Sequence, residues 1–561
     1  MVAVVVSSRL TERRRSTLAS LLPSGAAAGI LWVSPGQPLP PLGGVGAIVI
    51  DGPVGDRSAG DVAALTAAVV RGAHLVAVTG APAPGSNPEW ERLLGVTGTG
   101  DDGGPFGEYV VSVSPDDAGI AARLGPDIAV ADRFGPLQVC DGAVRVVAVV
   151  GFHRVPAVTE VVRGGGSVVV SGLGRHDQAL AGGDLAALLR RALRPRPALA
   201  ARPHNLGVVG YGPFGGMGYY HGRAAEATAG LALVATCDPD DGRRKAAEHD
   251  FPGVRTYADP GELAADDEVD VVVVATPPPS HTALVLDMLR AGKHVVCEKP
   301  LCITLAEADV IVAAAHEAGR VLTVHQNRRF DADFLTVRRA VEDGLLGEVF
   351  NVETFVGGFA HPCRAWHSEV AVSGGAVYDW GSHHLDWAME LLGGPPRTVQ
   401  THSHKRRWHD VTNLDQIRVR LLWDDGREAE FFQSDLAAVR RPKFFVQGTA
   451  GTLAGHYRTV TTERVEPPFG YTAVEAHHAE APADLVLAGY RAGEGVSETR
   501  LALVATRPFA FHRNLADHLQ FDEPLAVTPA AARRLVSVLE AAQRSSDRGN
   551  VLVTLADDRP R

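Results

Sequence analysis

The first 190 residues alternate short, uninterrupted apolar runs with helical spacings. Apolar runs of about four to eight residues are typical of strands that are buried on both faces of a parallel sheet. Residues 59–71 and 185–193 instead repeat their apolar positions with a helical period. The pattern predicts an α/β unit. Its expected strands are Ala3–Val6, Gly29–Val33, Ala47–Ile50, His74–Val78 and Val144–Val150, all parallel, and a last strand at Ser167–Ser171.

Residues 194–203 are rich in Pro, Arg and Ala. Proline interrupts helices and interior strands, so we expect a linker here between two units. A second α/β unit begins at once and extends to about residue 330. Its expected strands are Leu206–Val209, Leu231–Cys237, Val269–Ala275, His294–Cys297 and Val321–Val324.

Beyond residue 330 the pattern changes to alternating polar and apolar positions, as in Val349–Phe355, Asp415–Leu422 and Glu428–Phe432. Such alternation predicts an open, largely antiparallel sheet. A last helix is expected at Pro529–Arg544, with Thr528 as its N-cap and proline at its first position. The predicted organisation is therefore a domain at 1–193, a linker at 194–203, and further domains at 204–330 and 331–561.

Composition removes several classes of function. Hydrophobic residues make up 45% and charged residues 21% of the 561 residues, which is ordinary for a soluble protein, and no apolar run approaches the roughly 20 residues of a membrane span. The net charge of -11 comes without a large basic block, so nucleic acid is not an expected partner. The five cysteines are an odd number and predict reduced thiols. The basic cluster Arg13–Arg15 follows the first apolar run, the wrong order for a secretory signal, so we expect a cytoplasmic protein.

A glycine-rich segment, Gly210-Tyr211-Gly212-Pro213-Phe214-Gly215, directly follows an expected strand and precedes a helical stretch. Glycines at this spacing permit a tight turn and a close approach of the backbone to a pyrophosphate. The N–H groups at the start of the following helix can then bind the phosphates. In a chain with 61 glycines, the same segment taken alone is equally consistent with a simple tight turn.

Asp238 stands at the end of the next expected strand, where its carboxylate can accept hydrogen bonds from a ribose diol. The alternative is a helix cap. Pro239 follows, with no Arg or Ser immediately after to hold a 2′-phosphate, which favours NAD over NADP. Arg243 and Arg244 lie close enough in sequence to weaken that preference.

Three further motifs follow in order. Thr276-Pro277-Pro278-Pro279-Ser280-His281 and Glu298-Lys299-Pro300 each come after an expected strand, and Asp379-Trp380-Gly381-Ser382-His383-His384-Leu385-Asp386 comes later. Together with the glycine-rich segment, they resemble the glucose-fructose oxidoreductase / inositol dehydrogenase / rhizopine-catabolism (Gfo/Idh/MocA) family from about residue 204 to the end. The resemblance implies a Rossmann NAD-binding domain, then an α/β domain that forms the substrate pocket and the interface of a homo-oligomer. It also implies the cofactor-binding residues Gly210, Gly212, Pro213, Phe214, Gly215, Asp238, Thr276, Pro277, His281 and Glu298.

In that family the lysine of Glu-Lys-Pro and the Asp and His of D-x-G-x-H-x-x-D face the nicotinamide, and this sequence matches at Lys299, Asp379, His383 and Asp386. Oxidation of a secondary alcohol needs a base for the hydroxyl proton, and His383, with an ordinary pKa near ~6.5, suits that role. Asp379 lies four residues earlier, where a helix would place it to orient the imidazole. Lys299 would favour the developing alkoxide. Taken singly, each has a plainer interpretation, a solvated lysine or a structural histidine.

The segment His325-Gln326-Asn327-Arg328-Arg329-Phe330 follows a strand at the edge where open α/β sheets bind ligands. The resemblance places it in the substrate pocket, so we expect substrate contacts from Asn327 and Arg328, although both can be solvated loop residues. Trp366 can stack on a sugar ring or pack in a core, and His384 completes the expected substrate site. His361, Cys363, His367, His383 and His384 fall close together in sequence, but their spacing matches no zinc pattern, and no metal is expected.

Segments of residues 1–193 resemble the trehalose-utilisation family, which has a glutamine-amidotransferase-like fold. The matching segments are 61–72, 90–95, 128–132 and 156–177. A nucleophile elbow with Cys is missing, and Thr79-Gly80-Ala81-Pro82 stands where that family usually has a histidine. We therefore expect a binding or scaffold role, with His153 and His176 as polar residues to test; a structural role is the alternative for both.

Members of the two families occur together in disaccharide catabolism, where the dehydrogenase oxidises a glucosyl ring to its 3-keto form. The predicted function is accordingly NAD-dependent oxidation of a secondary hydroxyl of a sugar, polyol or glycoside. Two alternatives stay open. One is a glycoside hydrolase or lyase that oxidises its substrate transiently with bound NAD, and the other is a non-catalytic dinucleotide-binding sensor.

Overall fold

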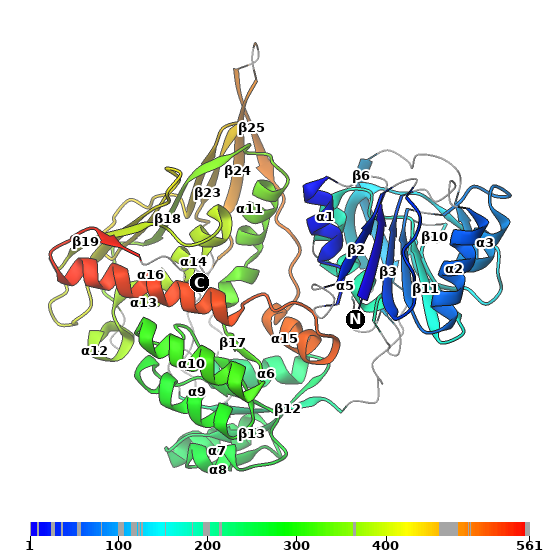
Figure 1. Cartoon of the computed structure of the whole chain (residues 1–561). Helices are drawn as coiled ribbons and strands as arrows, with labels where there is room; N and C mark the ends of the chain where they lie inside the picture. Colours follow the sequence, from blue (N-terminus) through cyan, green and yellow to red (C-terminus); the bar gives the residue numbers. More distant parts are fainter. Residues whose placement is uncertain are drawn as a thin grey trace. The chain divides into compact units, whose positions relative to one another are not determined.

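The computed structural model describes residues 2–7, 11–23, 29–34, 37–52, 58–79, 81–98, 106–113, 120–121, 124, 127–151, 153–181, 183–194, 202–212, 216–362, 366–458, 481–491, 493 and 495–555. By their packing, the residues divide into two units (Figure 1). The first is Met1–Ala201 with Asp517–Glu523, and the second is Arg202–Ala516 with Pro524–Arg561.

A nine-stranded mixed sheet in the order β2-β1-β3-β4-β11-β10-β9-β6-β7 forms the centre of the first unit. Strands β1 to β4 and β11 are parallel, whereas β10, β9, β6 and β7 are antiparallel to their neighbours. The strands of this unit, including the small β5–β8 pair, are β1 (Val2–Ser7), β2 (Ile30–Val33), β3 (Val45–Asp51), β4 (His74–Val78), β5 (Val96–Gly98), β6 (Phe106–Val113), β7 (Asp127–Arg133), β8 (Leu137–Val139), β9 (Arg145–Val150), β10 (Val155–Arg163) and β11 (Gly166–Ser171).

The predicted direction of the strand at 144–150 was wrong. Strand β9 occupies Arg145–Val150 but runs antiparallel to β10 and to β6. A continuous apolar run indicates that a strand is buried, and it carries no information on the direction of its neighbours.

Helices cover both faces of this sheet and create two cores. Leu18 and Leu21 beside α1, and Leu188 of α5, pack with Ala3 and Val5 of β1 on one face. The other face of the sheet packs against α2 and α3, because successive strand residues point to opposite sides. The helices are α1 (Glu12–Ala19), α2 (Ala59–Val70), α3 (Pro88–Leu94), α4 (Asp177–Ala181) and α5 (Gly183–Ala192).

Of the two histidines expected to be functional in this unit, His153 is exposed and His176 is paired. The ring Nδ1 of His176 lies 2.6 Å from Asp132 Oδ1. The buried Asp132 carboxylate also accepts the backbone N–H groups of Arg175 and His176. Asp132 therefore fixes both the loop after β11 and the orientation of the imidazole.

The second unit begins with a six-stranded, fully parallel sheet in the order β14-β13-β12-β15-β16-β17. The strand order reverses between β12 and β15, which is the arrangement of a Rossmann domain. Its strands are β12 (His204–Val209), β13 (Leu231–Cys237), β14 (Arg255–Tyr257), β15 (Val271–Val274), β16 (His294–Cys297) and β17 (Leu322–Val324). Its helices are α6 (Met217–Ala227), α7 (Asp241–Asp250), α8 (Pro260–Ala264), η2 (Pro278–Ser280), α9 (His281–Arg290) and α10 (Leu305–Ala318).

A nine-stranded sheet in the order β25-β24-β23-β22-β18-β21-β20-β19-β26 follows. The expectation of a largely antiparallel sheet is confirmed, since β18 and β21 form its parallel pair and its other neighbours are antiparallel. Its strands are β18 (Val349–Gly357), β19 (Thr398–His404), β20 (Gln416–Leu422), β21 (Glu428–Ser434), β22 (Phe444–Gly448), β23 (Gly451–His456), β24 (Asp484–Arg491), β25 (Gly495–Leu501) and β26 (Val553–Thr554).

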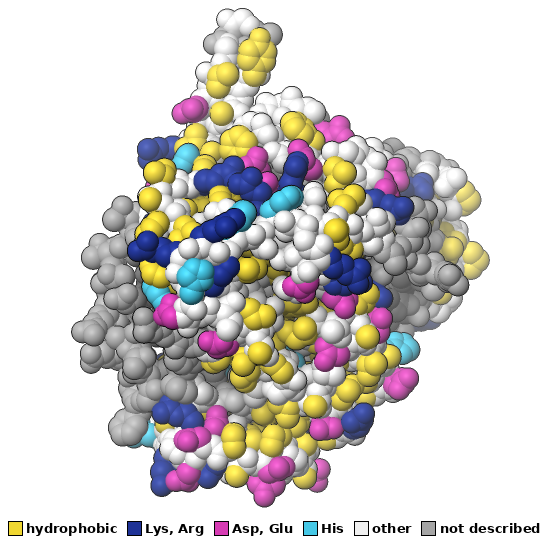
Figure 2. Space-filling model, turned by 90° about the vertical axis from the view of Figure 1, so that its left-hand side faces the viewer, with side chains coloured by type: hydrophobic (Ala, Val, Ile, Leu, Met, Phe, Trp, Pro, Cys, Tyr) yellow, Lys and Arg dark blue, Asp and Glu magenta, His cyan; other side chains and the backbone are white. Residues whose placement is uncertain are grey.

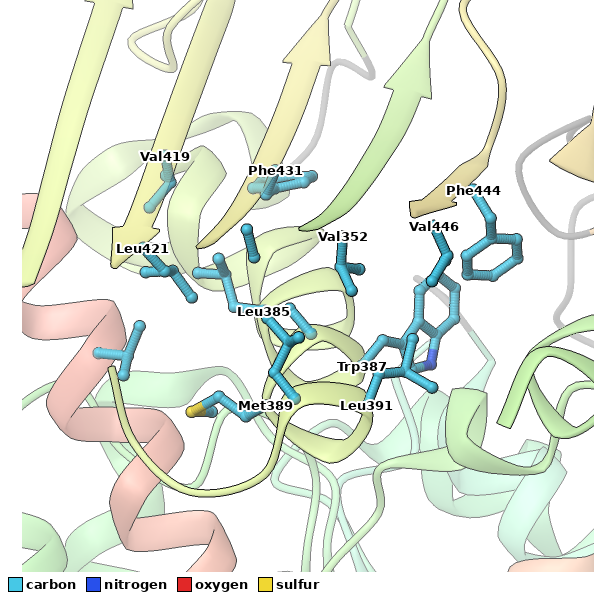
Figure 3. Packing of buried hydrophobic residues seen from close by; sticks show 14 of the residues in the cluster. Val352, Leu385, Trp387, Met389, Leu391, Val419, Leu421, Phe431, Phe444 and Val446 are labelled. Carbon is cyan, nitrogen blue, oxygen red and sulfur yellow. The ribbon is translucent and has the colours of Figure 1, made fainter. Parts of the chain in front are cut away.

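One face of this sheet packs against α14, whose Leu385, Trp387 and Met389 share a buried cluster with the strands, with Trp387 beside Phe444 (Figure 3). On the sheet, Arg418 pairs with Glu430 at 3.5 Å. Figure 2 shows basic side chains beside acidic ones on one surface of the molecule. The helices of this region are η3 (Asn327–Phe330), α11 (Ala332–Glu342), η4 (Trp366–Ser368), α12 (Val370–Ser373), α13 (Ala376–Asp379), α14 (Gly381–Leu392), α15 (Ala510–Phe521) and α16 (Pro529–Asp547).

The predicted last helix is confirmed, since Thr528 caps α16 by accepting the Ala531 N–H at 3.2 Å. Among the residues with a described placement, Cys140, Cys237, Cys297 and Cys302 are free thiols; Cys363 lies outside them. Within the same residues, each helix is too short or too polar to cross a bilayer.

Candidate active site

The glycine-rich segment closes tightly around the end of β12. Gly210 has φ +103°, and a Cβ on it would lie 2.6 Å from the Ala275 carbonyl oxygen. A Cβ on Gly218, in the first turn of α6, would lie 2.6 Å from the Gly210 oxygen, so helix and strand touch here. A Cβ on Gly212 would meet no described atom within 4 Å, so packing within the described protein does not itself require glycine there. Pro213, Phe214 and Gly215, expected to bind the cofactor, lie outside the described residues.

Asp238 fixes the turn around the expected adenosine site. Its Oδ2 accepts the Tyr211 N–H and its Oδ1 accepts the Asp240 N–H, both at 2.9 Å. Each carboxylate oxygen keeps a lone pair with which it can accept a ribose hydroxyl. The Arg244 guanidinium donates to the carbonyl oxygens of Asp238 and Pro239 at 2.8 and 2.9 Å.

His281, expected to contact the cofactor, lies in the interior and joins two loops. Its Nε2 is 2.7 Å from the Thr276 carbonyl oxygen and its Nδ1 is 2.9 Å from the Pro300 carbonyl oxygen. The imidazole thus connects the loop after β15, which carries Thr276 and Pro277, to the loop after β16, which carries Glu298 and Lys299. Burial lowers the pKa of His281, and this effect outweighs the hydrogen bonds to the two carbonyl groups, which raise it.

Lys299 and Asp379 form an ion pair between segments eighty residues apart. Lys299 Nζ lies 2.8 Å from Asp379 Oδ1 and 3.3 Å from the Asp379 carbonyl oxygen. Both side chains keep some exposure, 21% for Lys299 and 28% for Asp379. Burial raises the pKa of Asp379, but the charges of Lys299 and His367 outweigh that effect and hold it below its ordinary value.

His383 is buried in the first turn of α14, and its Nδ1 has no hydrogen-bond partner. The Asp379 carboxylate, expected to orient this ring, is bonded to Lys299 instead. Burial lowers the pKa of His383 well below its ordinary value, and the charges of Lys299 and Arg328 lower it further. The ring is therefore neutral near pH 7 and keeps a lone pair, with a basicity weaker than that of an ordinary histidine.

His384 and Asp386, the other two residues of the D-x-G-x-H-x-x-D segment that the sequence analysis considered, lie in the interior. His384 packs between Trp387 and Phe431, with ring centroids 4.7 and 4.9 Å away. Asp386 accepts two hydrogen bonds from Arg329, at 2.6 and 2.5 Å. In this structure both side chains fasten α14 to its neighbours.

The expected substrate residues lie on two short helical turns. Asn327 and Arg328 belong to η3 after β17, and the Arg328 guanidinium lies over the Trp380 ring, 5.6 Å from its centroid. Trp366 in η4 stacks on His367 with centroids 3.7 Å apart, so one face of its indole is already covered.

Two further groups near the ion pair, His367 and Asp435, were not identified from the sequence as active-site candidates. The pKa of His367 is lowered by burial and by Lys299, and raised by Asp379, so its ring lies within reach of both charges. Burial and the charge of Asp415 raise the pKa of Asp435 to about 7, and Asp379 contributes to the same rise. Asp435 directly follows β21, and a polar residue at a strand end was the signal that could have drawn attention to it.

The buried histidines make the fold sensitive to acid. Burial is the main cause that lowers the pKa of His383 and His384 well below the ordinary value. Below about pH 6.5 the unfolded chain binds protons that these folded rings refuse, so the unfolded state gains stability. We expect the free energy of unfolding to fall by up to about 1.4 kcal/mol per pH unit for each ring as the pH drops below that value.

Calorimetric unfolding at about pH 7.5 and about pH 5.5 tests this expectation. His384→Phe keeps an aromatic ring between Trp387 and Phe431 and removes one titrating group, so it should reduce the pH dependence by one proton. An unfolding temperature that is equal at both pH values would contradict the assignment of neutral rings.

The fold and this site define a dinucleotide-binding oxidoreductase class: a Rossmann sheet with a glycine turn, then an open sheet with a helix, α13, that brings Asp379 to Lys299 at the carboxyl end of the Rossmann strands. Residues 204–326 match the model described as "Oxidoreductase family, NAD-binding Rossmann fold" (GFO_IDH_MocA), and residues 334–454 match the GFO/IDH/MocA C-terminal domain. This chain belongs to the Gfo/Idh/MocA family over residues 204–454.

Individual relatives agree with this assignment. The oxidoreductase YdgJ of Escherichia coli is 29% identical over 60% of this chain and 93% of its own length. The 1,5-anhydro-D-fructose reductase of Ensifer adhaerens is 31% identical over 46% of this chain and 73% of its own, and the D-apiose dehydrogenase of Paraburkholderia graminis is 30% identical over 44% and 69%. The crystal structure of an NAD-binding protein from Listeria innocua aligns with a TM-score of 0.53 at 27% identity, over 63% of this chain and 97% of that one.

Proposed function

We propose that the second unit is an NAD(P)-dependent dehydrogenase that oxidises a secondary hydroxyl of a sugar, polyol or glycoside. The observation that carries the proposal is the Lys299–Asp379 pair next to the neutral, buried His383. The names of the reductase and the dehydrogenase among the relatives, which specify 1,5-anhydro-D-fructose and D-apiose, support a sugar as the substrate class.

The chain's own groups divide the chemistry between them. His383 accepts the hydroxyl proton of the substrate, because its ring is neutral at working pH. The Lys299 ammonium stabilises the negative charge that develops on the same oxygen, and Asp379 holds that ammonium in place at 2.8 Å. A bound oxidised nicotinamide dinucleotide would accept the hydride from the carbinol carbon.

The residues that would hold the dinucleotide are Gly210 and Gly212 at the turn, Asp238 at the ribose, and the loop at Thr276 and Pro277. Gly212 is compatible with a pyrophosphate, since a Cβ there would meet no described atom within 4 Å. NAD is preferred to NADP in this proposal, because Arg244 is held on two carbonyl groups beside Asp238 and no longer reaches outward for a 2′-phosphate.

The first unit contributes no catalytic group to this proposal. Its resemblance to the trehalose-utilisation family suggests a scaffold or binding unit for a glycosidic substrate, and a 3-keto product follows from the same analogy.

A screen of polyols, hexoses and disaccharides with NAD and with NADP, read by the absorbance of the reduced cofactor, tests the proposal. At least one compound should be oxidised with the formation of one reduced cofactor per molecule, and the rate should be higher with NAD than with NADP. Cleavage of a glycoside without net cofactor reduction would replace this function by transient-oxidation hydrolysis. Dinucleotide binding without turnover of any compound would leave only a sensor.

A further inference from the structure

Three histidines from distant parts of the chain meet in the interior of the second unit. His221 comes from α6, His325 directly follows β17, and His512 comes from α15. One ring nitrogen of each lies within 4.8 Å of those of the other two. All three are at most 1% exposed.

The Glu298 carboxylate belongs to the same cluster. Its Oε1 lies 2.9 Å from His221 Nε2 and 2.8 Å from His325 Nδ1. Glu298 itself is buried, and a carboxylate ordinarily carries a negative charge near pH 7. The lysine next to it in sequence does not compensate that charge, because the Lys299 ammonium is bonded to Asp379.

Two ring nitrogens of the cluster have no hydrogen-bond partner among the described residues. His221 Nδ1 meets His512 Nε2 at 2.9 Å, which with the two Glu298 contacts uses four of the six nitrogens. The other two, His325 Nε2 and His512 Nδ1, are buried without a partner. A neutral ring leaves a lone pair unused there, and a protonated ring leaves an N–H group without an acceptor. Neither state satisfies the site by itself.

The surroundings exclude water from the cluster. The Tyr220 ring lies 5.8, 5.6 and 5.9 Å from the rings of His221, His325 and His512. Phe511 lies 4.8 Å from His325 and 5.5 Å from His512. Such an apolar wall around nitrogen and carboxylate donors is typical of a closed metal site.

We propose that His221, His325 and His512 form a structural site for a divalent transition-metal ion, with zinc the best match. Neutral imidazoles are ligands that zinc accepts, and Glu298, which is hydrogen-bonded to His221 and His325, is the outer carboxylate that commonly orients such rings. Bond lengths of about 2.0–2.1 Å need ligand atoms about 3.3 Å apart, so ring nitrogens that lie within 4.8 Å of one another have to move closer. The ion supplies the positive charge that Glu298 lacks and uses imidazole lone pairs.

The proposed ion differs in position and role from the reacting groups. Glu298 Oε2 accepts the Lys299 backbone N–H at 3.1 Å, so an ion that fixes the imidazoles bonded to Glu298 would also steady the loop that carries the ammonium. The sequence did not suggest the site, because its ligands are spread from residue 221 to residue 512, far from the spacing of a zinc motif.

The test uses the full chain, purified without a histidine tag. Elemental analysis should find one zinc per chain. After removal of the metal with a chelator, equimolar Co²⁺ should restore the unfolding temperature and give the visible d–d absorption of four-coordinate cobalt. His512→Phe keeps a ring among Tyr220 and Phe511 but removes a ligand, so it should lose the cobalt absorption and the thermal stabilisation.

His316→Asn, on the exposed side of α10, is the matched control and should retain both signals. The proposal is overturned if the wild type is metal-free and Co²⁺ produces neither absorption nor stabilisation. It is equally overturned if His512→Phe binds cobalt as the wild type does. Should His512→Phe fail to fold, His512→Gln provides the same comparison, and the wild-type cobalt spectrum decides independently of either variant.

Discussion

Replacement of Lys299 by methionine is expected to lower kcat for cofactor reduction by about 10²–10³-fold, with dinucleotide affinity nearly unchanged. Methionine retains the length of the lysine stem and removes the charge that stabilises the developing alkoxide. The loss should therefore fall on kcat and kcat/KM together, as for an interaction made mainly in the transition state. Stopped-flow cofactor reduction and a separate titration of dinucleotide binding measure the two quantities.

The pH profile of the residual activity adds a second readout. Lys299 lowers the pKa of His383, so its removal should raise that pKa and move the acid limb of kcat/KM to higher pH. Lys245→Met is the control, since that ammonium is exposed and pairs with Asp241 on the surface of α7. Full turnover by Lys299→Met would exclude the proposed role. The role would also be excluded if Lys245→Met lost as much turnover as Lys299→Met.

Lys443→Met should destabilise the second unit by about 3–5 kcal/mol, because it leaves a buried carboxylate without its partner. Lys443 is 1% and Asp333 0% exposed, and Lys443 Nζ lies 2.7 Å from Asp333 Oδ2. The same oxygen accepts the Ala483 N–H at 2.8 Å, so the carboxylate has no path to water. Urea unfolding monitored by tryptophan fluorescence measures the loss.

A double variant separates the broken pair from lost packing. Lys443→Met combined with Asp333→Leu removes both charges, and we expect it to recover most of the stability, since an apolar replacement of a buried pair is often neutral. Arg223→Met breaks the exposed Arg223–Glu226 pair and should change little. If the single Lys443 variant were as stable as the Arg223 variant, the prediction that breaking the buried pair destabilises the second unit would be wrong.

Strand positions followed well from the sequence, whereas pairing did not. The expected strand at His74–Val78 has the observed bounds, because the short apolar run Leu75–Val78 is typical of a buried strand. The direction of β9 depends on partners that are distant in sequence, and strands such as β6, with alternating exposure, give a weaker signal.

The candidate site shows the same division. The Glu-Lys-Pro and D-x-G-x-H-x-x-D motifs pointed to Lys299, Asp379 and His383, but their partners depend on side-chain direction. The Asp379 carboxylate turned out to be bonded to Lys299, with the neighbouring His383 Nδ1 left unpartnered. Groups without a motif, such as Asp435 and the cluster of His221 and His512, depend wholly on tertiary contacts.

The parallel pairing of β18 with β21 has a consequence for how this fold can diversify. Neighbouring parallel strands cannot be joined by a hairpin. The chain leaves the sheet after Gly357, returns to it at Thr398 as β19, and reaches β21 through β20. That excursion carries Trp366, Asp379 and His383. Insertions or deletions near η4 can therefore change the surroundings of these three residues while the hydrogen-bond register of the sheet stays unchanged.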